Sequence, residues 1–273
     1  MKQPIRLVLI DVDGTLFGPN GVPQCAWEAA QRARAAGLHL SVCTGRPGRG
    51  LALQYAERLD PEGLHIFESG AVIVTGRGQL LRAFTLPPAV YRRLLELSRV
   101  YGIPFEVYTA EGGFYRESQH PDLLIHEQML GYPAQVCPLD PCEGLVRVQF
   151  VWRPSPAWQQ LREQIKQMPE VELHEATSPG MPGVGFSSVT AMGVSKRAAA
   201  RWIAAKLDLD LGCAAMIGDG ENDLELIQSV GLGIAMGNAP ETVKRAARWV
   251  VSTVENCGLE QALDAIVADL TPR

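Results

Sequence analysis

The most distinctive hydrophobic pattern in the chain is a run of four apolar residues at positions 7–10, Leu-Val-Leu-Ile. A short, partly β-branched apolar run predicts a strand that is buried on both faces. Further strands are predicted over 38–43 and 64–67, and helical stretches over 26–36 and 51–59 separate the three strands. This strand–helix alternation predicts a parallel sheet with right-handed crossovers.

The middle of the chain has a different rhythm of apolar and polar residues. A hairpin is predicted over 71–85, followed by helices over 88–101 and 158–168. Residues 119–144 are rich in Pro and His and give no clear assignment. The strands predicted in this part lie over 105–108, 113–116, 145–152, 171–175 and 186–190. We therefore expect residues 83–191 to form an inserted α+β domain with its own sheet.

The strand–helix alternation resumes at Val194 and continues to the closing helix over 259–270. Ser195 is a good N-cap for the first of these helices, and a strand is predicted over 214–217. We expect residues 1–82 and 192–273 to fold together as one parallel-sheet core of the α/β class. The insert would then interrupt this core.

Composition narrows the classes of partner. The chain has 273 residues, 47% of them hydrophobic, a formal net charge of −5 and no run of Lys or Arg. This argues against nucleic acid or an anionic membrane as the main partner. We expect no membrane span and no signal peptide, and hence a cytoplasmic protein. The six cysteines and five histidines lack metal-ligand spacing, so we expect reduced thiols and packing or surface histidines.

Residues able to carry chemistry follow the predicted strands of the core or begin the helix after the insert. If these strands are neighbours in one parallel sheet, the residues gather at the same edge of it. Carboxylates there would hold a divalent cation, while Lys, Thr and backbone amides would hold phosphate oxygens. The residues are Asp11, Asp13, Thr44, Gly45, Lys196, Asp219 and Asp223.

The Asp11–Asp13 pair also fits the start of a calcium loop, but the residues that follow fit poorly. An EF-hand needs a ligand at the fifth position, Gly at the sixth and Glu at the twelfth. Thr15, Leu16 and Val22 stand at these positions, and a strand precedes the pair where an EF-hand has a helix. The calcium interpretation is therefore the weaker one.

Four motifs in this order along the chain resemble the haloacid dehalogenase (HAD) superfamily. They are Asp-Val-Asp-Gly-Thr at 11–15, Thr-Gly-Arg at 44–46, Gly-Val-Ser-Lys at 193–196 and Gly-Asp-Gly-Glu-Asn-Asp at 218–223. The insert resembles the large C2-type (IIB) cap of the Cof-like branch. The resemblance covers nearly the whole chain and implies a Rossmann-like HAD core with an inserted cap domain.

The resemblance implies a phosphatase that uses Mg²⁺ and an aspartyl-phosphate intermediate. Asp11 would attack phosphorus, and Asp13 would protonate the leaving oxygen and then activate water. Asp11, the Asp13 carbonyl, Asp219 and Asp223 would hold the ion. Dehalogenation is disfavoured, because dehalogenases lack the second acid.

The resemblance also implies a set of residues around the phosphate. Thr44, Gly45 and Lys196 would bind its oxygens, and Asn222 would orient Lys196 or a carboxylate. Two roles stay open for Arg46: contact with the substrate, or an exposed position at a helix start. Ser69 stands where Cof-like chains often have Asn, which leaves a polar contact near the phosphate in question.

The implied substrate is a small phosphorylated metabolite, and sugar phosphates are the commonest type in the family. Two alternatives remain open: a phosphomutase of the same superfamily, whose cap would need several arginines, and a non-catalytic protein that binds a phosphometabolite. The sequence gives neither the individual substrate nor the oligomeric state.

Overall fold

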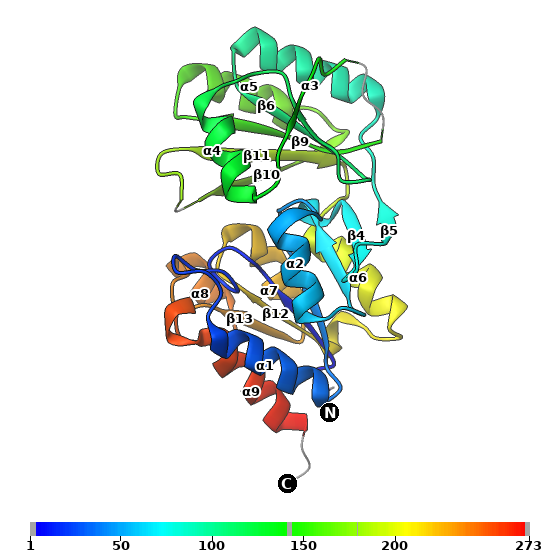
Figure 1. Cartoon of the computed structure of the whole chain (residues 1–273), viewed down its shortest axis with the longest axis vertical. Helices are drawn as coiled ribbons and strands as arrows, with labels where there is room; N and C mark the ends of the chain where they lie inside the picture. The colour runs from blue at the N-terminus through cyan, green and yellow to red at the C-terminus, as the bar shows by residue number, and fades with distance from the viewer. Residues whose placement is uncertain (1–3, 141–143, 179, 271–273) are drawn as a thin grey trace.

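The chain forms two stacked parts, each built on its own large β-sheet (Figure 1). The computed structural model describes residues 4–140, 144–178 and 180–270. One part contains a parallel sheet of five strands in the order β14-β13-β12-β1-β2. Its strands are β1 (Leu7–Ile10), β2 (His39–Val42), β12 (Ala214–Gly218), β13 (Leu232–Ala235) and β14 (Trp249–Val250). The predicted α/β class is confirmed.

Strand β1 lies between β12 and β2, and all four of its residues are buried. Val8 and Ile10 pack into the same apolar cluster as residues of α1, α2 and α9. Leu7 and Leu9 point to the other face, where they pack with α6 and α7. Helices therefore cover both faces, which explains why the strand carries no polar residue. The helices are α1 (Gln24–Ala35), α2 (Gly50–Leu59), α6 (Lys196–Lys206), α7 (Leu224–Ser229) and α9 (Gly258–Leu270).

The third predicted strand does not continue the parallel sheet as expected. Strand β3 (Leu64–Phe67) pairs with β4 (Val72–Thr75), and β4 pairs with β5 (Leu80–Ala83), in an antiparallel sheet. An isolated bridge between Cys43 and Ile66 links β3 to the end of β2. The ladder does not extend further because the Val42 N–H donates to the imidazole Nδ1 of His65 at 3.0 Å.

The second large sheet has six strands in the order β10-β11-β9-β6-β7-β8. Helices α3 (Pro88–Tyr101) and α5 (Pro156–Lys166) pack against one face of it, and α4 (Pro121–Leu130) contacts the other face. The strands are β6 (Phe105–Thr109), β7 (Phe114–Arg116), β8 (Gln135–Val136), β9 (Leu145–Trp152), β10 (Val171–Thr177) and β11 (Gly185–Ala191). All of them lie within residues 105–191.

Helix α4 and strand β8 occupy the part of 119–144 that the sequence left unassigned. The apolar residues of α4 are spread around the helix: Leu123 is fully buried, whereas Leu124 and Ile125 are exposed. No single apolar stripe marks the helix. Its N-cap is His120, whose ring accepts a hydrogen bond from the Asp122 N–H at 3.2 Å.

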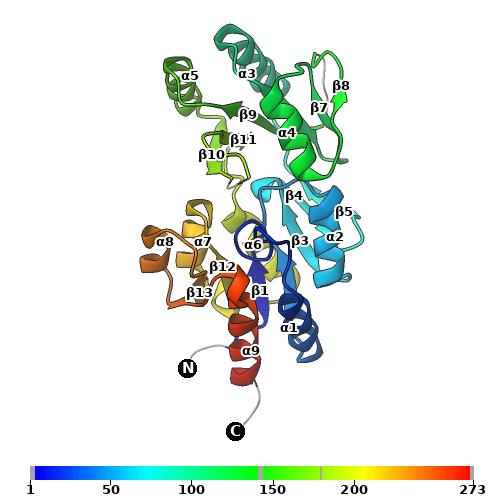
Figure 2. The same cartoon turned by 60° about the vertical axis from the view of Figure 1, so that its left-hand side comes forward.

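One pair of cysteines contradicts the expectation of reduced thiols. Helices α1 and α9 lie side by side in both views (Figures 1 and 2), and a disulfide joins Cys25 to Cys257, with Cα atoms 6.2 Å apart. The two residues are separated by 232 positions in the sequence, so no local spacing could indicate the pairing.

The remaining helical segments are short. In the described ranges, no helix is both long and apolar enough to cross a membrane. The short segments are η1 (Glu68–Gly70), η2 (Leu211–Cys213), η3 (Glu221–Asp223), α8 (Glu241–Ala246) and η4 (Val254–Asn256).

Candidate active site

Asp11 comes directly after β1, at the carboxyl end of the parallel sheet. Its N–H continues the ladder by donating to the Ile217 carbonyl at 3.0 Å. The chain then turns tightly through Gly14, whose φ is +83°. A Cβ at Gly14 would lie 2.0 Å from an oxygen of Asp219, so only glycine lets the first motif and the Asp219 loop approach this closely.

Lys196 is the first residue of α6, and the predicted N-cap at Ser195 is confirmed, because its hydroxyl accepts from the Ala198 N–H at 3.1 Å. The buried Lys196 ammonium donates to Asp11 Oδ1 at 2.7 Å and to Asp223 Oδ1 at 2.6 Å. Residues that are 185 and 27 positions away from Lys196 are thus brought into one cluster.

Asp219 and Asp223 follow β12, and each carboxylate has a fixed orientation. Asp223 is fully buried in η3 and accepts from the Gly220 N–H at 3.1 Å. Asp219 Oδ1 accepts from the Thr15 hydroxyl at 3.0 Å, and its Oδ2 accepts from the Asn238 amide at 3.2 Å. These hydrogen bonds restrict the directions in which the carboxylates can offer oxygen atoms.

No role was predicted for Thr15 or Asn238 from the sequence, although Thr15 belongs to the motif at 11–15. The Asn238 amide also donates to the Gly14 carbonyl at 2.8 Å, so it ties together the loops that follow β1, β12 and β13. Each residue lies just beyond a core strand, at the edge that already carries the acids. That position was the one signal in the sequence that could have found them.

The cluster carries more negative charge than Lys196 can balance. Burial raises the pKa of Asp11 well above its usual value, and the neighbouring acids raise it further, while Lys196 opposes them. Burial, together with Asp223, raises the pKa of Asp219 to about 7. Burial alone would lower the pKa of Lys196, but Asp11 and Asp223 outweigh it and raise that pKa well above its usual value. One carboxylate oxygen from each of Asp11, Asp219 and Asp223 lies within 4.8 Å of the others.

Asp13 lies apart from this cluster and forms an ion pair with Arg46. The Arg46 guanidinium donates to both carboxylate oxygens, with its Nε 2.8 Å from Oδ2 and its Nη2 2.6 Å from Oδ1. The Asp13 side chain is 48% exposed, whereas that of Arg46 is only 10% exposed and packs over the Phe17 ring. The alternative of an exposed Arg46 at a helix start is wrong.

The segment from Thr44 to Arg49 is a loop and not the start of a helix. Arg49 is extended, with φ −146°, and α2 begins only at Gly50. The buried Thr44 hydroxyl accepts from the Arg46 N–H at 3.1 Å. Gly45 follows, and a Cβ there would lie 3.3 Å from the Ser69 hydroxyl.

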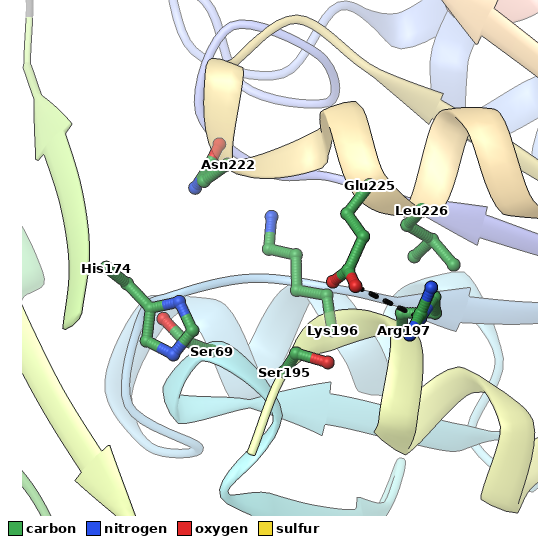
Figure 3. A pocket seen from close by; sticks show the side chains of 8 residues that line it. All are labelled: Ser69, His174, Ser195, Lys196, Arg197, Asn222, Glu225 and Leu226. Carbon is green, nitrogen blue, oxygen red and sulfur yellow. Dashed lines mark ion pairs between the residues drawn. The ribbon is translucent and has the colours of Figure 1, made fainter. Parts of the chain in front are cut away.

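A small cavity of about 50 Å³ adjoins Lys196 (Figure 3). Asn222 lines it from η3, Ser69 from η1 and His174 from β10 of the six-stranded sheet. The cavity has room for a few water molecules. The Lys196 ammonium donates its hydrogen bonds to Asp11 and Asp223, and Asn222 lines the same cavity.

Ser69 adopts a backbone conformation that explains why Asn suits its position. Its φ is +58°, in the left-handed region that Asn tolerates better than most side chains. Its N–H donates to the Thr44 carbonyl at 3.1 Å, so the turn is fixed against the Thr44 loop whichever side chain it carries.

Comparison with known proteins agrees with this arrangement. Residues 8–263 match the family of haloacid dehalogenase-like hydrolases. The chain belongs to this family. A Streptococcus pyogenes relative named "Putative phosphatase M6_Spy0533" is 26% identical over 95% of this chain and 97% of its own length.

Two solved HAD structures show the same fold. The phosphatase BT1666 from Bacteroides thetaiotaomicron superposes with a TM-score of 0.80, 24% identity, and coverage of 98% of this chain and 96% of that one. The HAD subclass IIB sugar phosphatase BT4131 superposes with a TM-score of 0.81, 21% identity, and coverage of 97% and 100%. At these identities the likeness establishes the fold.

Proposed function

We propose that this HAD hydrolase is a magnesium-dependent phosphatase that hydrolyses a small phosphorylated metabolite of the sugar phosphate type through an aspartyl-phosphate intermediate. One observation carries the proposal. The Lys196 ammonium is held between Asp11 and Asp223 at the strand-end edge of the sheet, with Asp219 close by. Family membership and relatives named as phosphatases support it.

In the first step, a carboxylate oxygen of Asp11 attacks phosphorus, and the bond from phosphorus to the substrate oxygen breaks. Asp13 gives its proton to that leaving oxygen. In the second step, Asp13 takes a proton from water, the water oxygen attacks phosphorus, and inorganic phosphate leaves with Asp11 restored. Lys196, Thr44 and the Gly45 amide hold the phosphate oxygens, and Asn222 lines the same side of the site.

Arg46 orients Asp13. Each Asp13 oxygen accepts one hydrogen bond from Arg46 and keeps a further lone pair that can exchange a proton with the substrate. The Nη1 of Arg46 is buried and has no hydrogen-bond partner among the described residues. An unsatisfied buried donor beside the reacting acids favours contact between Arg46 and a substrate oxygen.

The donor set fits a magnesium ion. Asp11, Asp219 and Asp223, with the Asp13 backbone carbonyl, offer the hard oxygen atoms that Mg²⁺ prefers. Burial and the neighbouring acids raise the pKa values of Asp11 and Asp219, and a bound cation would oppose both effects. When bound, the ion would neutralise the acids and reduce the repulsion between the nucleophile and the phosphate.

We further propose that residues 83–191 act as a cap domain on a core formed by residues 1–82 and 192–273. The six-stranded sheet takes all its strands from inside this segment and contributes His174 to the cavity beside Lys196. A cap in this position would exclude water from the reacting atoms and contact the leaving group.

The test is phosphate release by the full-length protein after treatment with a chelator. We expect hydrolysis of p-nitrophenyl phosphate, and faster hydrolysis of at least one member of a sugar phosphate panel, only after Mg²⁺ is restored. Asp11→Asn is expected to reduce the rate by roughly a thousandfold or more, because the nucleophile is lost. Asp264→Asn, which changes an exposed acid that binds Arg32 on the surface, is the matched control.

A quench experiment tests the intermediate. With ³²P-labelled substrate, we expect label on the denatured wild-type chain and none on Asp11→Asn. Undiminished hydrolysis by Asp11→Asn would refute the assignment of the nucleophile. Full activity in the presence of excess chelator would refute magnesium dependence.

A further inference from the structure

We propose that Glu68 and Arg147 form a positioning pair, through which closure of the cap sets the turn that holds the phosphate-binding residues. The inference rests on the proposed phosphatase function. Arg147 Nε and Glu68 Oε2 form an ion pair between β9 of the cap and η1 of the core, and each side chain is only 3% exposed. Neither residue was singled out by the sequence motifs.

On the cap side, Arg147 is held rigidly. Its guanidinium stacks on the Tyr108 ring with 3.9 Å between the guanidinium carbon and the ring centroid. Its Nη1 donates to Gln149 at 2.6 Å and to Ser188 at 2.9 Å. An arginine fixed in this way can transmit the position of the cap sheet to the residue that it contacts.

On the core side, Glu68 belongs to a turn that contacts three parts of the proposed site. The Glu68 N–H donates to the Arg46 carbonyl at 3.0 Å, and the Ser69 N–H donates to the Thr44 carbonyl at 3.1 Å. Gly70 packs so tightly on α6 that a Cβ there would lie 2.3 Å from the Ser195 carbonyl oxygen and 3.0 Å from the Lys196 nitrogen. A shift of this turn would therefore move Thr44, Arg46 and Lys196 together.

The turn is also strained. Glu68 has φ +52° and Ser69 has φ +58°, so two consecutive non-glycine residues lie in the left-handed region. Such conformations persist only where the surrounding structure imposes them, and they cluster at functional sites. The Glu68 side chain of this turn pairs with Arg147 of the cap.

Stability alone does not account for the pair. Burial raises the pKa of Glu68 to about 7 although Arg147 opposes this shift, so the attraction does not fully offset the removal of the carboxylate from water. Replacing one member of a buried ion pair leaves an uncompensated charge, whereas replacing both members removes both charges. The neutral double variant therefore separates a positioning role from a structural one.

The experiment compares Glu68→Gln, Arg147→Gln and the double variant, with Arg49→Gln as the matched control. Arg49 also bridges the core and the cap, because its Nη2 donates to the Glu111 carbonyl at 2.7 Å, but this contact does not involve the turn. For the double variant we expect a melting temperature close to wild type, an at least tenfold lower kcat and an almost unchanged KM. We expect Arg49→Gln to keep its kcat.

Three outcomes would overturn the proposal. One is a double variant with the kcat of wild type. Another is a kcat of Arg49→Gln that falls as far as that of Arg147→Gln. If the double variant does not fold, Arg147→Lys decides: it keeps the charge but loses the planar stacking, so a kcat between those of wild type and Arg147→Gln is expected. An unchanged kcat in Arg147→Lys would then refute the proposal.

Hydrogen exchange gives a readout that does not depend on activity. The amides of Glu68 and Ser69 are expected to exchange faster in Glu68→Gln than in wild type, and at the wild-type rate in Arg49→Gln. Unchanged exchange in Glu68→Gln would refute the positioning role even if the wild-type protein hydrolyses none of the phosphate esters. A failure of the proposed function and a failure of this inference can therefore be told apart.

Discussion

Replacing Lys196 with Met tests the electrostatic basis of the proposed site. The substitution keeps much of the apolar side chain and removes the charge that contacts Asp11 and Asp223. Coulomb's law at the 2.6 and 2.7 Å of the structure, with an effective dielectric constant of about 20, gives roughly 6 kcal/mol for each contact. The burial of three charged groups offsets much of this attraction. Breaking a buried pair in this way typically destabilises a protein by about 3–5 kcal/mol.

Thermal unfolding in the presence of chelator measures this loss. For a chain of this size, it corresponds to a fall in Tm of about 10 °C. The fall should be larger at pH 8 than at pH 5, because the buried acids left without Lys196 can take up protons at the lower pH. Lys206→Met is the matched control, since Lys206 ends the same helix and is exposed over the Trp202 ring.

The reasoning is refuted if Lys196→Met has the same Tm as the wild-type protein at pH 8 in the presence of chelator. The buried carboxylates would then be stable in the fold without the positive charge of Lys196. The electrostatic explanation of the cluster would be wrong. A Tm loss of equal size in Lys206→Met would show that the substitution acts through the helix and not through the buried charge.

Three further predictions follow from single contacts. Burial lowers the pKa of His65 to about 4, against 6.5 in the unfolded chain, so this group's stabilisation is complete above pH 6.5 and is lost as the pH falls towards 4. His65→Gln should therefore flatten the acid denaturation curve by up to about 3 kcal/mol, while His39→Gln, an exposed control, leaves the slope intact. Cys25→Ser should lower the free energy of unfolding by roughly 5 kcal/mol, because the disulfide closes a loop of 232 positions. Dithiothreitol should reproduce this loss in wild type and add nothing in the variant; any further loss there would contradict the assignment. Gly14→Ala should reduce phosphate release by about tenfold or more, since its Cβ would collide with Asp219, and normal activity would show that the two loops need not approach so closely.

Local patterns in the sequence determined the class of the core and the positions of its acids. The apolar run of β1 has no polar residue because helices cover both faces, so a buried strand could be predicted from four residues. Polar residues directly after such strands were expected at one sheet edge, and the structure brings Asp11, Lys196 and Asp223 within hydrogen-bond distance there. The N-cap at Ser195 could also be predicted from a local pattern, because its hydrogen bond joins residues only three positions apart.

Contacts between distant segments were decided only by the tertiary structure. The disulfide, the Arg46–Asp13 ion pair and the support of Asp219 by Asn238 each join residues that no period or spacing connects. The sequence likewise gave no sign that the ring of His65 would take the backbone hydrogen bond of Val42 and end the β2–β3 ladder. Periodicity indicates which side of an element is buried, because residues three or four apart share one face of a helix and residues two apart share one face of a strand. Which distant side chain fills the facing space depends on how the finished elements pack, and the structure alone contains that information.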